Sequence, residues 1–275
     1  MKGTFWRWTL AVVVTLGSLL WQRTTGPTYP ARGRVRLAGQ TITMSLDRSN
    51  STASDQLVKV RVPDPGVAGE VVWRRYPTAD PWQLIELRRD GENLAASLPR
   101  QPSAGKLEYQ VRLTRGAEHV LFPERPAVTR FRGDVPGWVL VPHILAMFLG
   151  MLFAVRAGIE ALAPRRGMRR LAWATLGLFL VGGFILGPLV QYYAFGQWWT
   201  GVPFGWDLTD NKTLLAVLAW VFALWRLRGG RAARVAVVVA AVVTLAVFAI
   251  PHSAWGSQID WSKLPDRPVG AGPGT

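Results

Sequence analysis

The chain has 275 residues, of which 49% are hydrophobic, and it carries 32 Lys and Arg against 17 Asp and Glu, a formal net charge of +15. The absence of cysteine excludes a disulfide scaffold, a thiolate metal site, covalent c-type haem attachment and a cysteine nucleophile. Such a charge can indicate a nucleic-acid partner. Here, however, the basic residues gather at the ends of apolar runs, which indicates a membrane and no nucleic acid.

The first apolar segment, Trp8 to Leu20, follows the basic residues Lys2 and Arg7. This order is typical of either a cleaved signal peptide or a retained membrane anchor. No pair of small residues of the kind that marks a cleavage site follows Leu20. We therefore expect residues 1–26 to form an N-terminal membrane anchor, with a signal peptide as the alternative.

Residues 27–134 have a different pattern, in which short alternating runs are separated by turn signals such as Pro63-Asp64-Pro65-Gly66 and Asp90-Gly91. The runs are Thr41–Leu46, Leu57–Val62, Glu70–Tyr76, Gln83–Arg88, Lys106–Leu113 and Ala127–Arg132. About 100 residues of this kind predict an all-β sandwich.

The stretch from Val71-Val72-Trp73 to Glu108-Tyr109-Gln110-Val111 resembles immunoglobulin-like or fibronectin-type-III-like modules. This resemblance implies a fold and no activity. We expect Trp73 and Trp82 to be core or rim aromatics of the sandwich, and His119 to be structural.

Four more apolar segments follow, and a bilayer core requires about 20 apolar residues. They are Trp138–Val155, Leu171–Tyr193, Thr213–Trp225 and Val235–Ile250. The second segment is long enough. The first is followed by an arginine and the last is preceded by one, and the long stems of these arginines can reach the headgroups. The third is short but follows a capping-type sequence, Asp210-Asn211. We expect residues 135–256 to form a four-span membrane domain and residues 257–275 to form an external Pro/Gly-rich tail.

The positive-inside rule places the clusters Arg165–Arg170 and Arg226–Arg234 in the cytoplasm. The β-domain, the loop 194–212 and the C-terminus are then external. The predicted fold class is a mixed membrane protein: an N-terminal anchor helix, an external all-β sandwich and a four-helix transmembrane bundle. A multi-pass protein of a bacterial-type inner (cytoplasmic) membrane fits this pattern.

The loop 194–212 is rich in aromatic residues, among them Trp198, Trp199, Phe204 and Trp206, with glycines between them. Such a surface is flat and apolar and lets a planar ligand approach closely. The alternative is an aromatic belt at the membrane interface, where tryptophan collects in membrane proteins generally.

Two histidines favour a ligand site. His143 lies near the outer end of the second span, and His252 lies just past the outer end of the fifth. An ionisable residue near hydrocarbon marks a functional site by default, although a single histidine there is often only an interfacial hydrogen-bonding group. A haem iron accepts two axial imidazoles, and a tryptophan-lined shelf can cover the macrocycle.

The order of these segments over residues 138–256 resembles the core of the cytochrome c assembly, or haem-handling, membrane proteins. Gly201, Phe204, Trp206, Asp207 and Asp210 match the tryptophan-rich signature of that family without a gap. The family has two external histidine motifs. The second is similar to His252-Ser253-Ala254-Trp255-Gly256, with one residue inserted, and the first is similar, more weakly, to His143-Ile144-Leu145-Ala146-Met147.

This resemblance implies haem as the cofactor, with His143 and His252 as the axial iron ligands. The other implied cofactor-binding residues are Trp198, Trp199, Phe204, Trp206, Asp207, Asp210 and Trp255. Thr200 and Phe204 stand where the family usually has tryptophan. These departures favour haem binding or assembly over a complete synthase, and no catalytic residue is assigned.

Three questions stay open at this stage. The chain could instead be a membrane-anchored scaffold or assembly subunit whose external β-sandwich binds an envelope protein or a cytochrome. A quinone site using Asp207, Asp210 and a histidine is a third alternative, since these groups handle protons. Lys212 is expected to form an ion pair with Asp210, the alternative being a haem propionate.

Overall fold

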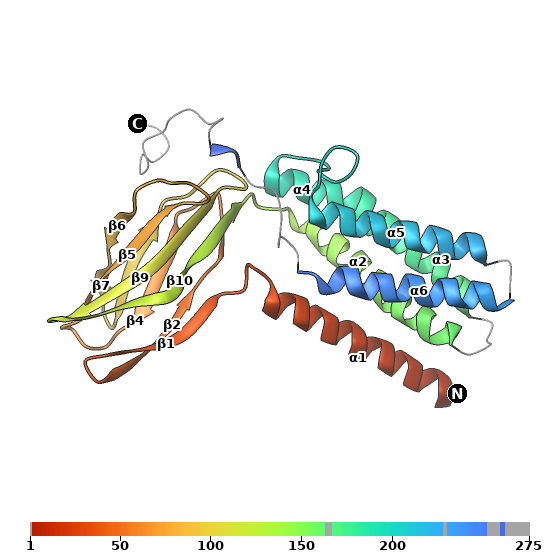
Figure 1. The fold of residues 1–275 in the computed structure, drawn as a ribbon, viewed down its shortest axis with the longest axis horizontal. Helices are drawn as coiled ribbons and strands as arrows, with labels where there is room; N and C mark the ends of the chain where they lie inside the picture. Colours follow the sequence, from red (N-terminus) through yellow and green to blue (C-terminus); the bar gives the residue numbers. More distant parts are fainter. Residues whose placement is uncertain (1, 163–166, 228–229, 252–258, 262–275) are drawn as a thin grey trace. The chain divides into compact units, whose positions relative to one another are not determined.

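The computed structural model describes residues 2–162, 167–227, 230–251 and 259–261. An N-terminal helix precedes a β-rich region, and further helices follow, as the sequence predicts (Figure 1). The chain separates into two units. Of the described residues, 2–26 and 135–251 belong to the helical unit, and 27–134 with 259–261 belong to the β-rich unit.

The β-rich unit contains three hydrogen-bonded sheets. Its strands are β1 (Ala31–Leu37), β2 (Gln40–Leu46), β3 (Ser49–Ser51), β4 (Gln56–Arg61), β5 (Ala68–Arg75), β6 (Gln83–Glu86), β7 (Arg88–Asp90), β8 (Asn93–Leu98), β9 (Lys106–Arg115) and β10 (Glu118–Arg132). The largest sheet has the order β3-β10-β9-β5-β6, the second has the order β4-β8-β7, and β1 and β2 form a hairpin. Each of the six alternating runs overlaps one of these strands.

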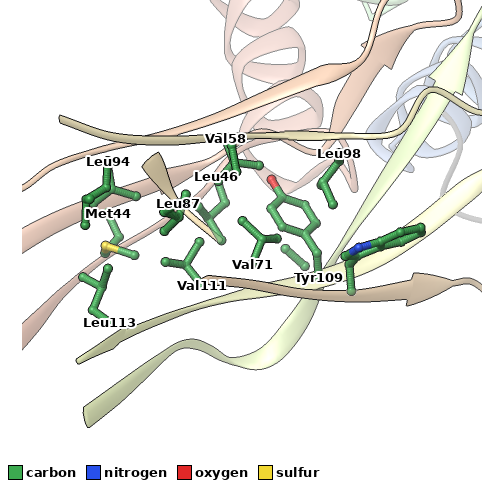
Figure 2. Packing of buried hydrophobic residues seen from close by; sticks show 14 of the residues in the cluster. Met44, Leu46, Val58, Val71, Leu87, Leu94, Leu98, Tyr109, Val111 and Leu113 are labelled. Atoms are coloured by element: carbon green, nitrogen blue, oxygen red, sulfur yellow. The ribbon is translucent and has the colours of Figure 1, made fainter. Parts of the chain in front are cut away.

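One hydrophobic core fills the space among the three sheets. Figure 2 shows side chains of β2, β4, β5, β8 and β9 converging on it. Alternation along the strands produces this arrangement, because successive side chains of a strand point to opposite faces. Trp73 is 2% exposed and belongs to the core, whereas Trp82 is 39% exposed at its rim, as expected for both.

The core also encloses a small polar network. The Tyr109 hydroxyl donates to the Asp47 carbonyl at 2.6 Å, and the Gln56 amide donates to the same carbonyl at 2.9 Å and to the Tyr109 oxygen at 3.1 Å. The Thr129 hydroxyl donates to the Gln56 side-chain oxygen at 2.5 Å. Burial raises the pKa of the Tyr109 phenol, so the group stays protonated and acts as a donor. Each buried polar atom of the network thus has a partner.

The helical unit contains α1 (Lys2–Thr25), α2 (Gly137–Ala161), α3 (Met168–Phe179), the π-helix η1 (Leu180–Leu186), α4 (Gly187–Phe195), α5 (Leu208–Arg226) and α6 (Gly230–Ala249). Within the described residues, four helical segments are long and apolar enough to cross a membrane: Thr4–Thr25, Gly137–Ala161, Met168–Phe195 and Arg231–Ala249. The predicted short span 213–225 is helical as well, within α5, but it is not among these four.

Small residues let these helices approach one another closely. A Cβ atom added at Gly158 would lie 2.7 Å from the Cβ atom of Ala241 in α6, and one added at Gly150 would lie 2.7 Å from the Phe179 ring in α3. Fully or almost fully buried alanines belong to the hydrophobic cluster that these helices form: Ala154, Ala157, Ala161, Ala216, Ala223, Ala236, Ala240 and Ala241.

A buried charge cluster joins α1 to α2. The Glu160 carboxylate accepts from Arg7 of α1 at 3.2 Å and from Arg156 of α2 at 2.5 Å, and all three side chains are at most 11% exposed. Trp8 lies beside the cluster, with its ring centroid 5.3 Å from the Arg156 guanidinium and 5.8 Å from the Phe153 ring. At the other end of α1, the Gln22 amide donates to the Phe248 carbonyl of α6 at 2.8 Å. The N-terminal helix is therefore attached to the rest of the unit at both ends.

This cluster generates a stability prediction. Glu160→Gln removes the acceptor shared by two buried arginines, and breaking a buried ion pair from one side costs about 3–5 kcal/mol. We expect a clear loss of stability in detergent, measured by thermal or denaturant unfolding. Glu92→Gln is the matched control, because Glu92 pairs with Arg61 at a surface where the two side chains are 60% and 72% exposed. That change should cost less than about 1 kcal/mol. Equal losses in the two variants would contradict a special role of the cluster.

Candidate functional site

The aromatic loop connects α4 to α5 at one end of the helical unit (Figure 1). Helix α4 ends where Gly196 adopts a left-handed conformation, with φ of 74°, and its N–H donates to the Tyr192 carbonyl at 2.7 Å. Glycine is the residue that adopts this conformation without steric cost, so it ends the helix and turns the chain. The loop then runs from Gly196 to Asp207, the N-cap of α5.

A buried carboxylate holds the loop closed. Asp210, in the first turn of α5, is 8% exposed, and its Oδ2 accepts the backbone N–H of Thr200 at 2.6 Å. In the orientation that satisfies both ends of the Gln191 amide, its nitrogen donates to Asp210 Oδ1 at 2.9 Å and its oxygen accepts from the Thr200 hydroxyl at 2.6 Å. A buried charge requires such donors. We call Gln191, Thr200 and Asp210 the loop latch.

Asp207 and Asn211 secure the second half of the loop. Asp207 caps α5 by accepting from the N–H groups of Thr209 at 2.8 Å and Asp210 at 3.4 Å, and its own N–H donates to the Thr200 carbonyl at 2.9 Å. The Asn211 side-chain oxygen accepts from the Val202 N–H at 2.8 Å. Both aspartates of the sequence signature therefore have a positioning role in this structure.

The four predicted aromatic residues fall into two pairs. Trp198 stacks on Tyr192 with the ring centroids 4.4 Å apart, and Trp199 stacks on Phe184 of η1 at 5.1 Å. Phe204 and Trp206 are instead 81% and 87% exposed. The first pair attaches the loop to the helices, and the second pair presents apolar rings outward.

His143 lies on α2, where its ring faces the π-helix η1. Its Nδ1–H donates to the Gly182 carbonyl at 2.9 Å. Because a carbonyl only accepts, this bond places the proton on Nδ1 and leaves the Nε2 lone pair available as a ligand. Pro188, the second residue of α4, has no backbone N–H group, so one backbone hydrogen-bond donor is missing directly after η1. π-helical turns inside helices are frequent at functional sites.

Lys212 corrects one of the sequence predictions. Its side chain is 4% exposed, and its Nζ donates to the Ile250 carbonyl at 2.7 Å. The predicted ion pair between Lys212 and Asp210 is therefore wrong. Residues two positions apart on a helix do not face each other, so Asp210 points to the loop while Lys212 points to α6. This bond holds the end of α6 next to the start of α5.

The structure brings part of the predicted site to one end of the helical unit. His143, Trp198, Trp199, Phe204, Trp206, Asp207 and Asp210 lie on α2, on the loop or on the first turn of α5. His252 and Trp255 lie outside the described residues. No group of three or more His, Asp or Glu side chains that could hold a metal ion occurs in the described ranges.

Sequence reasoning missed Gln191 and the latching role of Thr200. Gln191 is a neutral polar residue in an apolar run that contains no charged residue, Leu171–Tyr193, and a polar side chain there requires a partner. That feature was the available signal.

Comparisons with known proteins assign no family to the chain. No family model, no curated protein and no solved structure matches it.

The loop latch and the close packing around Gly205 generate a second prediction. A Cβ atom at Gly205 would lie 2.5 Å from the Thr200 carbonyl oxygen, and Asp210→Ala removes the acceptor of the latch. Hydrogen bonds to charged groups contribute about 1.5–3 kcal/mol, so Asp210→Ala should open the loop about 10- to 100-fold more often. Gly205→Ala should also open it more often, because its Cβ atom would displace the Thr200 carbonyl. Chymotrypsin cleavage after Phe204 or Trp206, followed by mass spectrometry, measures this opening.

Gly177→Ala is the matched control for these variants, because nothing lies within 4 Å of a Cβ atom at Gly177. Its cleavage rate in the loop should equal that of the unmodified chain. If Gly205→Ala and Asp210→Ala are cleaved no faster than Gly177→Ala, the latch does not restrain the loop.

Proposed function

We propose that the chain is a haem-binding integral membrane protein related in function to cytochrome c maturation factors. Haem would lie at the outer membrane face, between His143 and His252 and against the loop containing Trp206 and Asp207. One observation carries the proposal: His143 has its Nδ1–H committed to the Gly182 carbonyl and its Nε2 available, at the end of the unit where a latched loop exposes aromatic rings.

The described residues fit this cofactor. When bound, haem supplies an iron that takes axial imidazoles and a planar apolar surface. His143 and His252 would hold the iron. Phe204 and Trp206, which are 81% and 87% exposed, offer the apolar area that a macrocycle would cover. Asp207 and Asp210 would hold the loop in place and are already hydrogen-bonded within it.

Lys212 does not enter this site as a propionate partner. Its ammonium group is buried and donates to the Ile250 carbonyl. Its role would be to hold the end of α6, two residues before His252, beside the first turn of α5. No catalytic step is assigned to these residues, so binding or transfer of haem is the proposed activity.

The proposed orientation follows from the charges at the opposite end of the unit. The start of α1, the end of α2, the start of α3, the end of α5 and the start of α6 lie at that end (Figure 1). Basic residues are concentrated there: Arg7, Arg156, Arg169, Arg170, Arg226, Arg231 and Arg234. By the positive-inside rule this end would be cytoplasmic. The β-rich unit, as an immunoglobulin-like sandwich, would then be external to a bacterial-type inner membrane.

Haem binding is tested by variants of the ligands and of the loop. His143→Ala and His252→Ala should each weaken haem retention at least about tenfold, since loss of even an outer-shell partner costs that much in metal affinity. Added imidazole should partly restore the visible spectrum. The Soret absorbance per chain of the detergent-purified protein measures this.

Two matched controls accompany the haem test. His119→Ala changes an exposed histidine of β10, and Trp261→Tyr changes a tryptophan whose indole N–H donates to the Tyr76 carbonyl in the β-rich unit. Neither should alter haem content, whereas Trp206→Tyr should lower it at unchanged protein abundance. Equal spectra in all these variants would contradict the assignment of His143 and His252 as axial iron ligands. The loop would then be an interfacial aromatic belt.

The orientation is tested separately by reporter fusions. A reporter after Arg166 or Arg231 should behave as cytoplasmic, and one after Asp134 or Thr275 as external, because the basic clusters determine the insertion direction. Protease protection of the reporter in spheroplasts is the measurement. An external result at Arg166 would overturn the topology and the shared depth of His143 and His252.

A second candidate function is a membrane-anchored assembly subunit whose β-rich unit binds an envelope protein. The observation that favours it is a surface groove of about 360 Å³ lined by residues of β4, β6, β7 and β8. Its lining is Leu57, Ile85, Glu86, Arg88, Ala95, Ala96 and Ser97. Leu57 is 59% exposed, so it offers apolar contact area for a partner. A purified chain without a Soret band would favour this function over haem binding.

A further inference from the structure

Three arginines project from the outer face of the hairpin formed by β1 and β2. Arg32, Arg34 and Arg36 alternate along β1 with inward-facing residues, and all three are exposed. The strand register places each of them opposite a hydroxyl residue of β2: Arg32 opposite Ser45, Arg34 opposite Thr43 and Arg36 opposite Thr41. These six residues form what we call the arginine ladder.

The arginine ladder has an uncompensated positive charge. Residues 31–46 contain no acidic residue. Arg34 and Arg36 make no hydrogen bond, ion pair or ring contact with any residue that the structure describes, whereas Arg32 contacts the Tyr29 hydroxyl and ring. Of the strands in contact with the hairpin, β4 contributes no acid, and the one acid of β9, Glu108, pairs with Arg74. In β10 the Glu118 carboxylate accepts from the Ala38 N–H. Glu124 of β10 is the other acid on these neighbours.

The chemistry of the arginine ladder fits an array of phosphates. Guanidinium groups bind phosphate oxygens in a bidentate manner, and hydroxyl groups can donate to the same oxygens. Alternate residues of a strand lie about 6.6–6.8 Å apart, so the ladder presents three successive anion sites. Directly opposite residues have Cβ atoms about 4.5–5.5 Å apart, which brings each hydroxyl next to its arginine.

Chain connectivity limits how far the ladder can lie from the end of α1. Helix α1 ends at Thr25 and β1 begins at Ala31. Even a fully extended link of this length spans only about 20 Å. Thr4–Thr25 is long and apolar enough to cross a membrane, and Tyr29, in the link, is of the residue type that collects at membrane interfaces.

We propose that the arginine ladder binds the phosphate headgroups of anionic phospholipids at the membrane surface where α1 ends. The proposal rests on membrane insertion of α1 and is independent of haem binding. Juxtamembrane basic residues each contribute to attraction by anionic lipids, and this attraction is screened by salt. The hairpin would thus limit the freedom of the β-rich unit with respect to the bilayer.

The test uses the full chain reconstituted in vesicles. Because the chain has no cysteine, Gln40→Cys provides a single site for a fluorophore at an exposed position of the hairpin, outside the six residues of the ladder. Quenching by a headgroup spin-labelled lipid is compared in phosphatidylcholine vesicles and in vesicles in which about a third of the lipid is phosphatidylglycerol. We expect stronger quenching with phosphatidylglycerol, and its loss in about 1 M salt, where the Debye length is about 3 Å.

Arg34→Gln and Arg36→Gln, each introduced into the labelled chain, should each lower the equilibrium constant for contact between the hairpin and the lipid headgroups about fivefold. The matched control is Arg61→Gln on β4, whose guanidinium is already paired with Glu92 at 2.8 Å. Its quenching should stay close to that of the labelled parent. Equal quenching in the two lipids, as an acidic protein partner would give, overturns the proposal.

Flotation of the labelled chain with phosphatidylcholine vesicles distinguishes a failure of membrane insertion from a failure of headgroup binding. A chain that does not float overturns the membrane assignment and, with it, this proposal. A chain that floats and shows lipid-independent quenching overturns this proposal alone. The Soret absorbance of the arginine variants should equal that of the parent, so the outcome is distinguishable from a failure of haem binding.

Discussion

A carboxylate removed from water must be surrounded by donors, and this requirement at Asp210 determines the shape of the candidate site. Its two oxygens engage the Thr200 backbone N–H and the Gln191 amide. These contacts tie a loop, a helix end and a second helix start to one point. The orientation of the exposed rings of Phe204 and Trp206 depends on it, because both residues follow Thr200 in the loop and belong to neither hydrophobic core.

The same requirement operates at the opposite end of the helical unit. Glu160 neutralises one of the two arginines that face it, and α1 is thereby joined to α2. Between the two ends, alanine and glycine contacts permit close helix packing, which suits an environment where burial of apolar area alone does not drive association. The polar groups at the ends and the small residues between them together define a unit that holds His143 in a fixed position against η1.

Much of this architecture was predictable from the sequence, and the failures have physical causes. The strands β2, β4, β5 and β9 follow from alternation of apolar and polar residues. Strand β1 was missed because its alternation is between arginine and small or apolar residues, and β3 because three residues carry no period.

Some features of the candidate site were likewise open to prediction from the sequence, and others were not. Asp210-Asn211 was predicted as the capping sequence, and this was wrong: the N-cap of α5 is Asp207, and Asp210 and Asn211 lie within the helix. Aspartate is a favoured N-cap residue, so both positions have the same local signal and only the structure distinguishes them. The bond between Asp210 and Thr200, the contact of His143 with Gly182 and the contact of Lys212 with Ile250 join residues distant in sequence or in different elements. No local pattern contains that information. During synthesis, moreover, Arg7 precedes its partner Glu160 by 153 residues, which at about 5–20 residues per second is a delay of about 8–30 s. Throughout that interval α1 has no acidic partner from α2, and residues 27–134 of the β-rich unit emerge and have time to fold before α2 can pack against α1.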